Sequence, residues 1–178
     1  MTHPPGARDR LEAIYRAYYP AIYQYAVRRA GSPDDAADVI SETFLIAWRR
    51  IDDVPEDDEG LLWLYGVARR VLFNQRRGAS RRAVLAERLR EELAADLRVA
   101  PADLDHVRDA FDRLSSRDRE VLALACWESL TSEQIGKVLG CTATAVRIRL
   151  HRARQRLAKG LGLADEGNPT AELRGESL

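Results

Sequence analysis

The chain has 178 residues, of which 46% are hydrophobic, so it is long enough for one or two small packed domains. Its 28 basic and 28 acidic residues give a net charge of zero, which by itself argues against a nucleic-acid-binding protein. No stretch approaches the roughly 18 consecutive apolar residues of a membrane-spanning helix. The N-terminus lacks the apolar segment of a secretion signal, so we expect a cytoplasmic protein without membrane insertion.

The first segment predicted to be helical covers residues 11–23. Its apolar side chains recur at the spacing of one buried helix face: Leu11, Ile14, Tyr15, Tyr18, Ile22 and Tyr23. We expect Pro20 to bend or restart this helix, because proline removes a backbone hydrogen bond. The tyrosines fit core and rim packing better than a stacking platform for bases, because their spacing matches the buried face.

A strong helix-start signal follows Gly31. Ser32 can cap the backbone, Pro33 suits the first helical position, and two acids follow at the positive end of the helix dipole. We predict that this helix runs to about Arg50. Its inward side chains are Ala36, Ile40, Phe44, Ala47 and Trp48.

The same helix carries a polar stripe bordered by aliphatic side chains. Its polar members are Asp35, Asp38, Glu42 and Arg49. Leu45 and Ile46 lie immediately beside them. Exposed aliphatics next to carboxylates fit a protein partner better than DNA, whose phosphates would repel the acids. The alternative is a helix buried on nearly all sides of a larger bundle, and the residues alone leave both interpretations open.

Residues 52–60 contain six acids and no bases, and we expect them to form an exposed acidic loop. The next predicted helix, residues 61–77, turns Trp63, Leu64, Val67 and Val71 inward. The opposite side gathers Arg69, Arg70, Phe73, Arg76 and Arg77. Cations interleaved with an aromatic ring suit single-stranded or distorted DNA. The alternative for Phe73 is an ordinary, partly buried side chain.

Residues 78–103 are rich in Ala, Arg and Glu and poor in large apolar residues, so we interpret them as a linker, helical in part. When extended, these 26 residues reach at most about 90 Å. Two turns of B-DNA span roughly 70 Å, so one chain could hold two DNA-binding elements that far apart. Helices are predicted next over residues 104–114 and 116–130.

Residues 131–157 have the pattern of a helix-turn-helix. Thr131 and Gln134 form a capping box, and Gly140 suits the left-handed residue that ends a helix. The apolar face between them consists of Ile135, Val138 and Leu139. A second helix, which contains five arginines, can start at Thr142.

This second helix separates an apolar stripe from a basic face. The stripe consists of Val146, Leu150, Ala153 and Leu157, and the opposite side of Thr144, Arg147, Ile148, His151, Arg152 and Gln155. A recognition helix reads bases with its outward residues and grips phosphates with those at its margins. The candidate base readers are therefore Arg147, His151 and Arg152. The candidate phosphate contacts flank them: Arg149, Arg154 and Arg156. Taken alone, the alternative is a solvated basic helix that covers a core.

The charge is distributed in two basic islands. Residues 61–82 contain six basic and no acidic residues, and residues 131–160 contain seven basic residues and one acidic residue. A local patch, not the mean charge, sets the field that phosphate experiences, so the electrostatics predict two DNA contacts.

The two cysteines, Cys126 and Cys141, have no metal-binding spacing, and we expect buried, reduced thiols. We predict no metal, no cofactor and no catalytic residue, because the sequence shows no ligand cluster and no set of nucleophile, base and orienting group. The chain is therefore not expected to be an enzyme.

Three segments, in this order and spacing, resemble the extracytoplasmic-function sigma factors, the smallest members of the sigma-70 family: DAADVISETFLIAW, WLYGVARRVLFNQRR and LSSRDREVLALACWESLTSEQIGKVLGCTATAVRIRLHRARQRL. The likeness covers about residues 11–157, apart from the linker. It implies an all-α protein of two small helical domains joined by a linker. These would be region 2 (8–77), the linker (78–103) and region 4 as a helix-turn-helix four-helix domain (104–160). Residues 161–178 are polar and acidic with few apolar side chains, so we expect a flexible tail.

The resemblance also implies roles for individual residues. Region 2 would bind the promoter −10 element through Arg69, Arg70, Phe73, Asn74, Arg76 and Arg77. Region 4 would bind the −35 element through Thr144, Arg147, Ile148, Arg149, His151, Arg152 and Arg154. The surface for the polymerase core would be formed by Asp38, Glu42, Leu45 and Ile46. Residues 52–60 correspond to the loop that captures a flipped −10 base. The sequence departs from the family pattern at Ala37, where an acid is usual, and at Arg70, where an amide is common.

The implied partners are RNA polymerase core, through its β′ clamp helices and β flap, and promoter DNA, with an anti-sigma factor as a further candidate. Binding energy would open the DNA, since extruding a base costs a few kcal/mol that pocket contacts offset. The rival is a non-sigma helix-turn-helix regulator that binds a palindrome as a dimer. It would need a dimerisation surface or ligand pocket in residues 1–100. A protein-only adaptor conflicts with the basic residues of 131–160.

Overall fold

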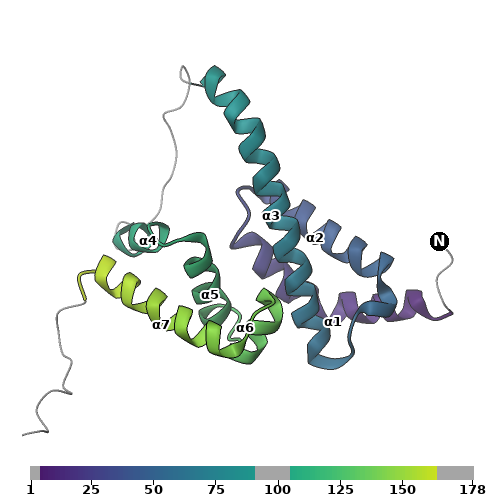
Figure 1. Cartoon of the computed structure of the whole chain (residues 1–178). Helices are drawn as coiled ribbons and strands as arrows, with labels where there is room; N and C mark the ends of the chain where they lie inside the picture. The colour runs from purple at the N-terminus through teal and green to yellow at the C-terminus, as the bar shows by residue number, and fades with distance from the viewer. Residues whose placement is uncertain (1–4, 91–104, 164–178) are drawn as a thin grey trace, which may run out of the picture.

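The computed structural model describes residues 5–90 and 105–163, and all regular structure in those ranges is helical (Figure 1). The N-terminal helices are α1 (Ala7–Val27), α2 (Pro33–Arg49), the 3₁₀ helix η1 (Ile51–Asp53) and α3 (Asp57–Arg90). The C-terminal helices are α4 (Asp105–Asp112), α5 (Ser116–Cys126), α6 (Ser132–Leu139) and α7 (Ala143–Gly160). The prediction of two small all-α units is confirmed.

The helix ends follow the capping signals of the sequence. The Ser32 hydroxyl accepts a hydrogen bond from the Asp35 amide at 3.1 Å, directly before the proline that opens α2. At α6 both halves of the capping box form, because Thr131 caps the Gln134 amide and the Gln134 side chain caps the Thr131 amide. Gly140 ends α6 with a φ of 69°. These local predictions are confirmed because they depend on neighbouring residues alone.

Pro20 does not restart α1, which runs without a break through the proline. Ile14 before it and Ile22 after it are both buried, so packing against one core keeps the two halves in one helix despite the missing amide. The prediction for the tyrosines is only partly right. Tyr15 and Tyr23 are 45% and 42% exposed, whereas Tyr25, which the pattern did not include, is fully buried.

The core of region 2 lies between α1, α2 and α3. Its fully buried members come from these helices and from the segment after α2: Ile22, Val39, Ile51, Val54 and Leu64. Each such side chain contributes about 1.5–3 kcal/mol relative to an exposed position. This core holds α2 and α3 together, so the surfaces they expose have a fixed relation to each other.

Residues 52–60 are not one exposed loop, which corrects the prediction. They begin within η1 and end in the first turn of α3, where Asp57 and two further acids favour the positive end of the helix dipole. The segment is anchored on α1, since Tyr18 donates a hydrogen bond to the Asp57 carbonyl at 2.7 Å and Arg10 donates one to the Val54 carbonyl at 2.6 Å. Gly60 permits this fold, because a Cβ there would lie 2.8 Å from the Pro55 carbonyl oxygen.

Helix α3 extends to Arg90, well into the range interpreted as a linker. Residues 91–104 lie outside the described residues. In the tail, α7 ends at Gly160 and Gly162 has a φ of 72°, while residues 164–178 also lie outside the described part of the chain. The exact domain boundaries therefore stay predictions.

The predicted region 4 contains α4 to α7 in the described part of the chain. Its most deeply buried side chains are Val121, Leu124, Ile135, Val146 and Ala153. Helices α6 and α7 approach each other closely at Gly136, where a Cβ would lie 2.6 Å from the Cys141 carbonyl oxygen. The turn of the helix-turn-helix therefore packs directly against the backbone of α6.

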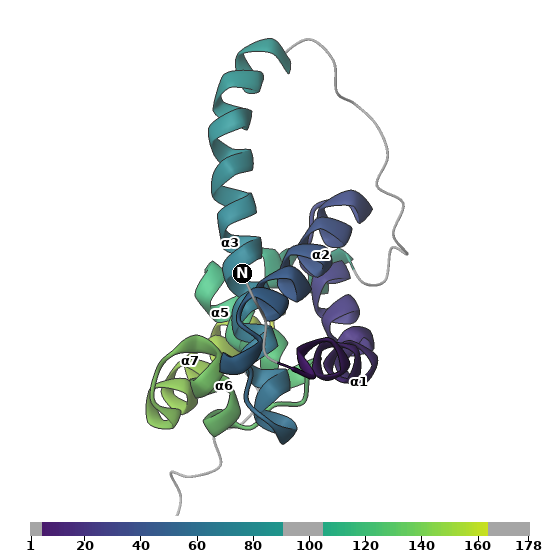
Figure 2. The ribbon, with the colours of Figure 1, turned by 90° about the vertical axis from the view of Figure 1, so that its right-hand side faces the viewer.

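The two regions pack against each other through α6 and the N-terminal half of α3 (Figures 1 and 2). The Val138 carbonyl lies 3.8 Å from the position of a Cβ on Gly66, and Lys137 forms an ion pair with Glu59. Cys126 is exposed and Cys141 is half-buried, and both are free thiols. The prediction of buried cysteines is wrong, because Cys126 lies at the exposed end of α5.

Candidate nucleic-acid interface

Helix α7 presents the predicted −35 residues on its outer face. Val146 and Ala153 face the core and are almost fully buried. Six of the seven predicted −35 residues are exposed: Thr144, Arg147, Ile148, His151, Arg152 and Arg154. The exception is Arg149, which is half-buried and faces region 2. The helical periodicity therefore predicted which side chains of α7 are exposed, but it could not predict that region 2 faces Arg149.

Contacts within region 4 divide the arginines of α7 into two groups. Arg147 forms an ion pair with Glu133 at 3.2 Å and donates to the Thr144 hydroxyl at 3.1 Å. Both partners are exposed, so DNA phosphate can replace them at small cost. Arg156 instead pairs with Asp118, whose side chain is buried. Arg156 therefore holds α7 on α5, and its predicted role as a phosphate contact stays a prediction.

Helix α3 exposes most of the predicted −10 residues on one side. The exposed members are Arg70, Phe73, Asn74, Arg76 and Arg77. The Phe73 ring is 59% exposed, and the Arg77 guanidinium lies 5.7 Å from its centroid. The ring is therefore accessible on this side of α3, and its stacking role stays a prediction. Arg69 is half-buried, and Arg76 donates a hydrogen bond to the Arg29 carbonyl at 2.7 Å.

The four residues predicted to contact the polymerase core meet at one surface hollow of about 540 Å³ between α2 and α3. They are Asp38, Glu42, Leu45 and Ile46. Asp38 and Leu45 are exposed, so α2 is not buried on all sides and the bundle alternative is excluded. Asn74 of the predicted −10 set lines the same hollow, which places the two surfaces side by side.

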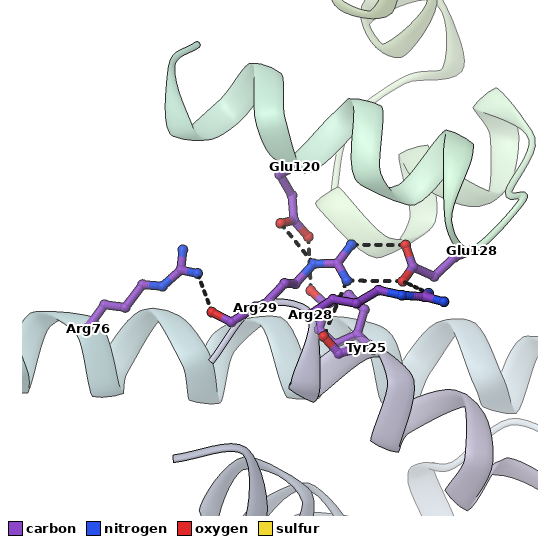
Figure 3. Close-up of polar contacts among 6 residues, drawn as sticks. All are labelled: Tyr25, Arg28, Arg29, Arg76, Glu120 and Glu128. Atoms are coloured by element: carbon purple, nitrogen blue, oxygen red, sulfur yellow. Dashed lines mark hydrogen bonds and ion pairs between the residues drawn. The ribbon is translucent and has the colours of Figure 1, made fainter. Parts of the chain in front are cut away.

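A buried polar cluster joins the two regions (Figure 3). Arg29 at the end of α1 donates two hydrogen bonds to the Glu128 carboxylate, at 3.0 and 2.9 Å. Its Nε lies 3.5 Å from a Glu120 carboxylate oxygen, and the Tyr25 hydroxyl donates to Glu120 at 2.9 Å. The side chains of Arg29 and Glu128 are only 6% and 2% exposed. A two-point guanidinium–carboxylate contact of this kind has a defined geometry.

Burial, hydrogen bonds and neighbouring charges shift the pKa values of this cluster. Burial raises the pKa of Tyr25, and the nearby Glu120 carboxylate raises it further. For Arg29, burial acts to lower the pKa, but hydrogen bonding to Glu128 and the surrounding negative charge outweigh it, so the pKa is raised. Burial also raises the pKa of Tyr65 to about 12. Arg29 therefore stays charged, and the carboxylates of Glu120 and Glu128 compensate its buried charge.

The sequence reasoning did not identify this cluster. Ile22 and Tyr25 are three residues apart on one face of α1, and Arg29, two residues past the end of α1, continues the same spacing. That spacing could have indicated that Arg29 lies on a buried face. The glutamates on the other side of the contact carry no comparable signal, because nothing local distinguishes them from solvated acids.

Comparison with known proteins identifies the family of this chain. Residues 14–82 match the family model for sigma-70 region 2, and residues 104–157 match the model for sigma-70 region 4. The chain is 30% identical over 162 residues to the ECF RNA polymerase sigma factor SigL of Mycobacterium tuberculosis, covering 86% of this chain and 92% of SigL. This chain is an extracytoplasmic-function sigma factor of the sigma-70 family. As such it binds RNA polymerase core and promoter DNA through regions 2 and 4 and directs transcription initiation.

Further relatives support the same family. The sigma factor is 30% identical over 164 residues to the RNA polymerase sigma factor CarQ of Myxococcus xanthus, covering 88% of this chain and 92% of CarQ. It is 27% identical over 161 residues to YlaC of Bacillus subtilis, covering 86% of this chain and 93% of YlaC. The rival interpretation, a non-sigma regulator, is not favoured by these matches.

Two solved structures share the fold. One is the sigma factor RpoE in complex with the anti-sigma factor NepR from Bartonella quintana, with a TM-score of 0.65 and 23% identity, covering 85% of this chain and 96% of that chain. The other is CnrH in complex with the cytosolic domain of CnrY, with a TM-score of 0.61 and 23% identity, covering 85% and 87%. Among the described residues of this sigma factor, no helix is long and apolar enough to cross a membrane.

Proposed function

We propose that the exposed face of α7 reads the −35 element and that the exposed face of α3 contacts the −10 element. The observation that carries the proposal is the presence of two separate exposed arginine faces, one on each helical domain. The −35 set is Thr144, Arg147, Ile148, Arg149, His151, Arg152 and Arg154. The −10 set is Arg69, Arg70, Phe73, Asn74, Arg76 and Arg77.

On α7, position along the helix divides these roles. Thr144 and Arg147 lie near its N-terminus, where a recognition helix meets base edges. Arg147 and Arg152 can each offer a two-pronged donor to guanine, and the exposed Ile148 can contact a thymine methyl group. Arg154, near the C-terminal end, is placed to grip phosphate.

On α3, the exposed ring of Phe73 lies among cations. Arg70 and Arg77 are exposed on either side of it in the sequence and can follow the DNA backbone. The ring can stack on or wedge beside a base as the duplex opens, which offsets part of the few kcal/mol required to unstack a step. The short segment between η1 and α3 is the candidate site for capturing a flipped base, in place of the longer loop expected from the sequence.

The hollow between α2 and α3 is proposed to receive the β′ clamp helices of the polymerase. Its rim combines the carboxylates of Asp38 and Glu42 with the aliphatic side chains of Leu45 and Ile46. That mixture suits a protein surface and would repel phosphate. Region 4 would contact the β flap, and an anti-sigma factor is proposed as a further partner. The chain would act in the cytoplasm by binding, without catalysing a reaction.

Promoter binding at both elements requires the two regions to separate. Arg69 and Arg76 of the −10 set and Arg149 of the −35 set line one interdomain hollow in this structure. Two promoter elements about two helical turns apart are roughly 70 Å from each other. Region 4 must therefore leave α3, with residues 78–103 spanning the distance.

Run-off transcription with purified polymerase core tests the overall assignment. Promoter-specific initiation that depends on the added chain supports it. Binding of a palindrome without core, and no initiation with core, would support the rival dimeric regulator.

We expect Arg147→Ala or Arg152→Ala to weaken binding of −35 DNA by roughly 1–3 kcal/mol for each lost two-pronged base contact. Core binding should be unchanged, because neither arginine lines the hollow between α2 and α3. Fluorescence anisotropy with −35 DNA measures the first effect, and co-purification with core measures the second. Arg108→Ala on the exposed surface of α4 removes the same charge and serves as the control. Loss of core binding in either variant would show that these arginines are structural.

Neutralising Asp57, Asp58 and Glu59 is expected to raise the DNA affinity of the free sigma factor. These acids oppose phosphate, and Glu59 forms an ion pair with Lys137 of the helix-turn-helix, so removing them also weakens the contact that covers α3. The measurement is the Kd for promoter DNA without polymerase, at two salt concentrations.

The control for this prediction removes three acids from α1 and α2, as Asp9→Asn, Glu12→Gln and Asp34→Asn. It changes the net charge equally but leaves the segment before α3 intact. If both triple variants bind promoter DNA with equal affinity, the effect arises from net charge and not from the position of these acids. An unchanged affinity after neutralising residues 57–59 would refute the role of this segment.

A further inference from the structure

A hollow of about 400 Å³ lies between region 2 and region 4, beside the polar cluster of Figure 3. Helices α1 and α3 form one wall, and α5, the end of α6 and α7 form the other. Five of the lining side chains are arginines and one is a carboxylate: Arg29, Arg69, Arg76, Arg117, Arg149 and Glu120. Neither region forms this hollow alone.

The positive charge around the hollow is not balanced. Arg29 pairs with Glu120 and Glu128. The other four arginines form no ion pair with a carboxylate among the side chains that the structure describes, residues 5–77 and 106–163. Arg76 donates only to a backbone carbonyl, which carries no net charge. Like charges around one small volume repel, and the packing of region 4 against region 2 through α6 and α3 increases this repulsion.

The chemistry of the lining points to phosphate. Guanidinium groups present a rigid fork of donors that matches phosphate oxygens, and several of them can share one multiply charged anion. A volume of about 400 Å³ is within the range of small-molecule pockets, about 300–1,000 Å³. Leu72, Phe73 and Leu139 provide an apolar side on which a flat ring could rest.

We propose that this hollow binds a small molecule carrying two or more phosphate groups, and that the bound anion holds region 4 against region 2. The anion offsets the repulsion between arginines of opposite walls, so it favours the packed arrangement. Arg69, Arg76 and Arg149 then face the ligand and are withheld from DNA. The binding step stands independently of the DNA assignments, whereas its effect on promoter binding rests on the proposed function.

Calorimetric titration of the full chain with tripolyphosphate and with ATP tests the binding step. The informative variant is Arg117→Gln, because Arg117 is exposed on α5, outside both predicted DNA surfaces. We expect it to weaken binding of both probes at least about tenfold. Arg113→Gln is the matched control, since Arg113 is also exposed but lies outside the hollow, and it should leave the Kd unchanged. Circular dichroism confirms that both variants are folded.

The two probes distinguish the sources of the phosphate groups. If ATP binds more tightly than tripolyphosphate, and Phe73→Ala removes the difference, the ligand of the hollow is a nucleotide. Equal affinities assign an inorganic polyphosphate. Either result supports the proposal. Absence of binding by both probes, or equal losses in Arg117→Gln and Arg113→Gln, would overturn it.

Competition with promoter DNA tests the consequence. With ligand at ten times its Kd, mutually exclusive binding raises the apparent Kd for promoter DNA about tenfold. In Arg117→Gln the DNA affinity without ligand should be no higher than that of the parent, because one repelling charge is removed, and the competition should disappear. Ligand binding without competition would refute the coupling. Loss of −35 binding in Arg147→Ala with unchanged ligand binding would confirm that the two sites are separate.

Discussion

Replacing Glu128 by alanine is expected to release region 4 from region 2 while both regions remain folded. Glu128 is the buried partner of Arg29, and its removal leaves the Arg29 charge with only Glu120 at 3.5 Å. Breaking a buried ion pair by deleting one partner costs about 3–5 kcal/mol, because the remaining charge is uncompensated. Separating the domains restores water to Arg29 and avoids this cost. The variant should therefore be more extended than the parent.

Small-angle scattering of the free chain measures this change as an increase in the radius of gyration. The matched control is Glu12→Ala, which removes an exposed ion pair to Arg16, worth only about 0.2–1 kcal/mol. Glu128→Ala should also bind promoter DNA more tightly without polymerase, and it should bind polyphosphate more weakly. An unchanged radius of gyration would show that the α3–α6 contact alone holds the regions together.

Replacing Gly136 by alanine is expected to disrupt the helix-turn-helix. A Cβ at this position would lie 2.6 Å from the Cys141 carbonyl oxygen and 3.5 Å from the Ala143 amide nitrogen. Both neighbours are backbone atoms, so no side chain can rotate away to make room. Overpacking costs about 1–3 kcal/mol, occasionally more, and here the turn and the start of α7 must move. We therefore expect loss of stability in region 4 and loss of −35 binding.

Gly66→Ala on α3 is the matched control for Gly136→Ala. A Cβ there meets only the Val138 carbonyl oxygen at 3.8 Å, which is ordinary contact, and alanine is favoured over glycine inside a helix by about 0.5–1 kcal/mol. Urea denaturation and hydrogen exchange of the α6 and α7 amides compare the two variants. Similar stabilities would contradict the close packing seen at Gly136.

Much of this fold is predictable because its determinants are local. Ser32 and Thr131 cap the backbone a few residues away, and the apolar stripe of α7 follows from a period of 3.6 residues. The same period places Arg147 and Arg152 on the outer face, where the structure finds them exposed. These features can be predicted without knowing which helices pack against each other.

The errors share a different origin. Helix α1 does not restart at Pro20, because burial on both sides of the proline outweighs one missing hydrogen bond. Residues 57–59 enter a helix because Tyr18 and Arg10, far away in the sequence, anchor the preceding backbone on α1. In each case a tertiary contact overrides a correct local tendency.

The sequence by itself determined the helices, their caps, the two arginine faces and the family, because all of these depend on residues close to one another along the chain. Only the tertiary structure decided that Arg29 is buried against Glu128 and that Arg149 faces region 2. About a hundred residues separate the two partners of that ion pair, and a solvated and a buried glutamate have the same local signature. Whether a side chain is buried depends on which surfaces of the folded chain pack together. The free energy of a charged group depends on that burial.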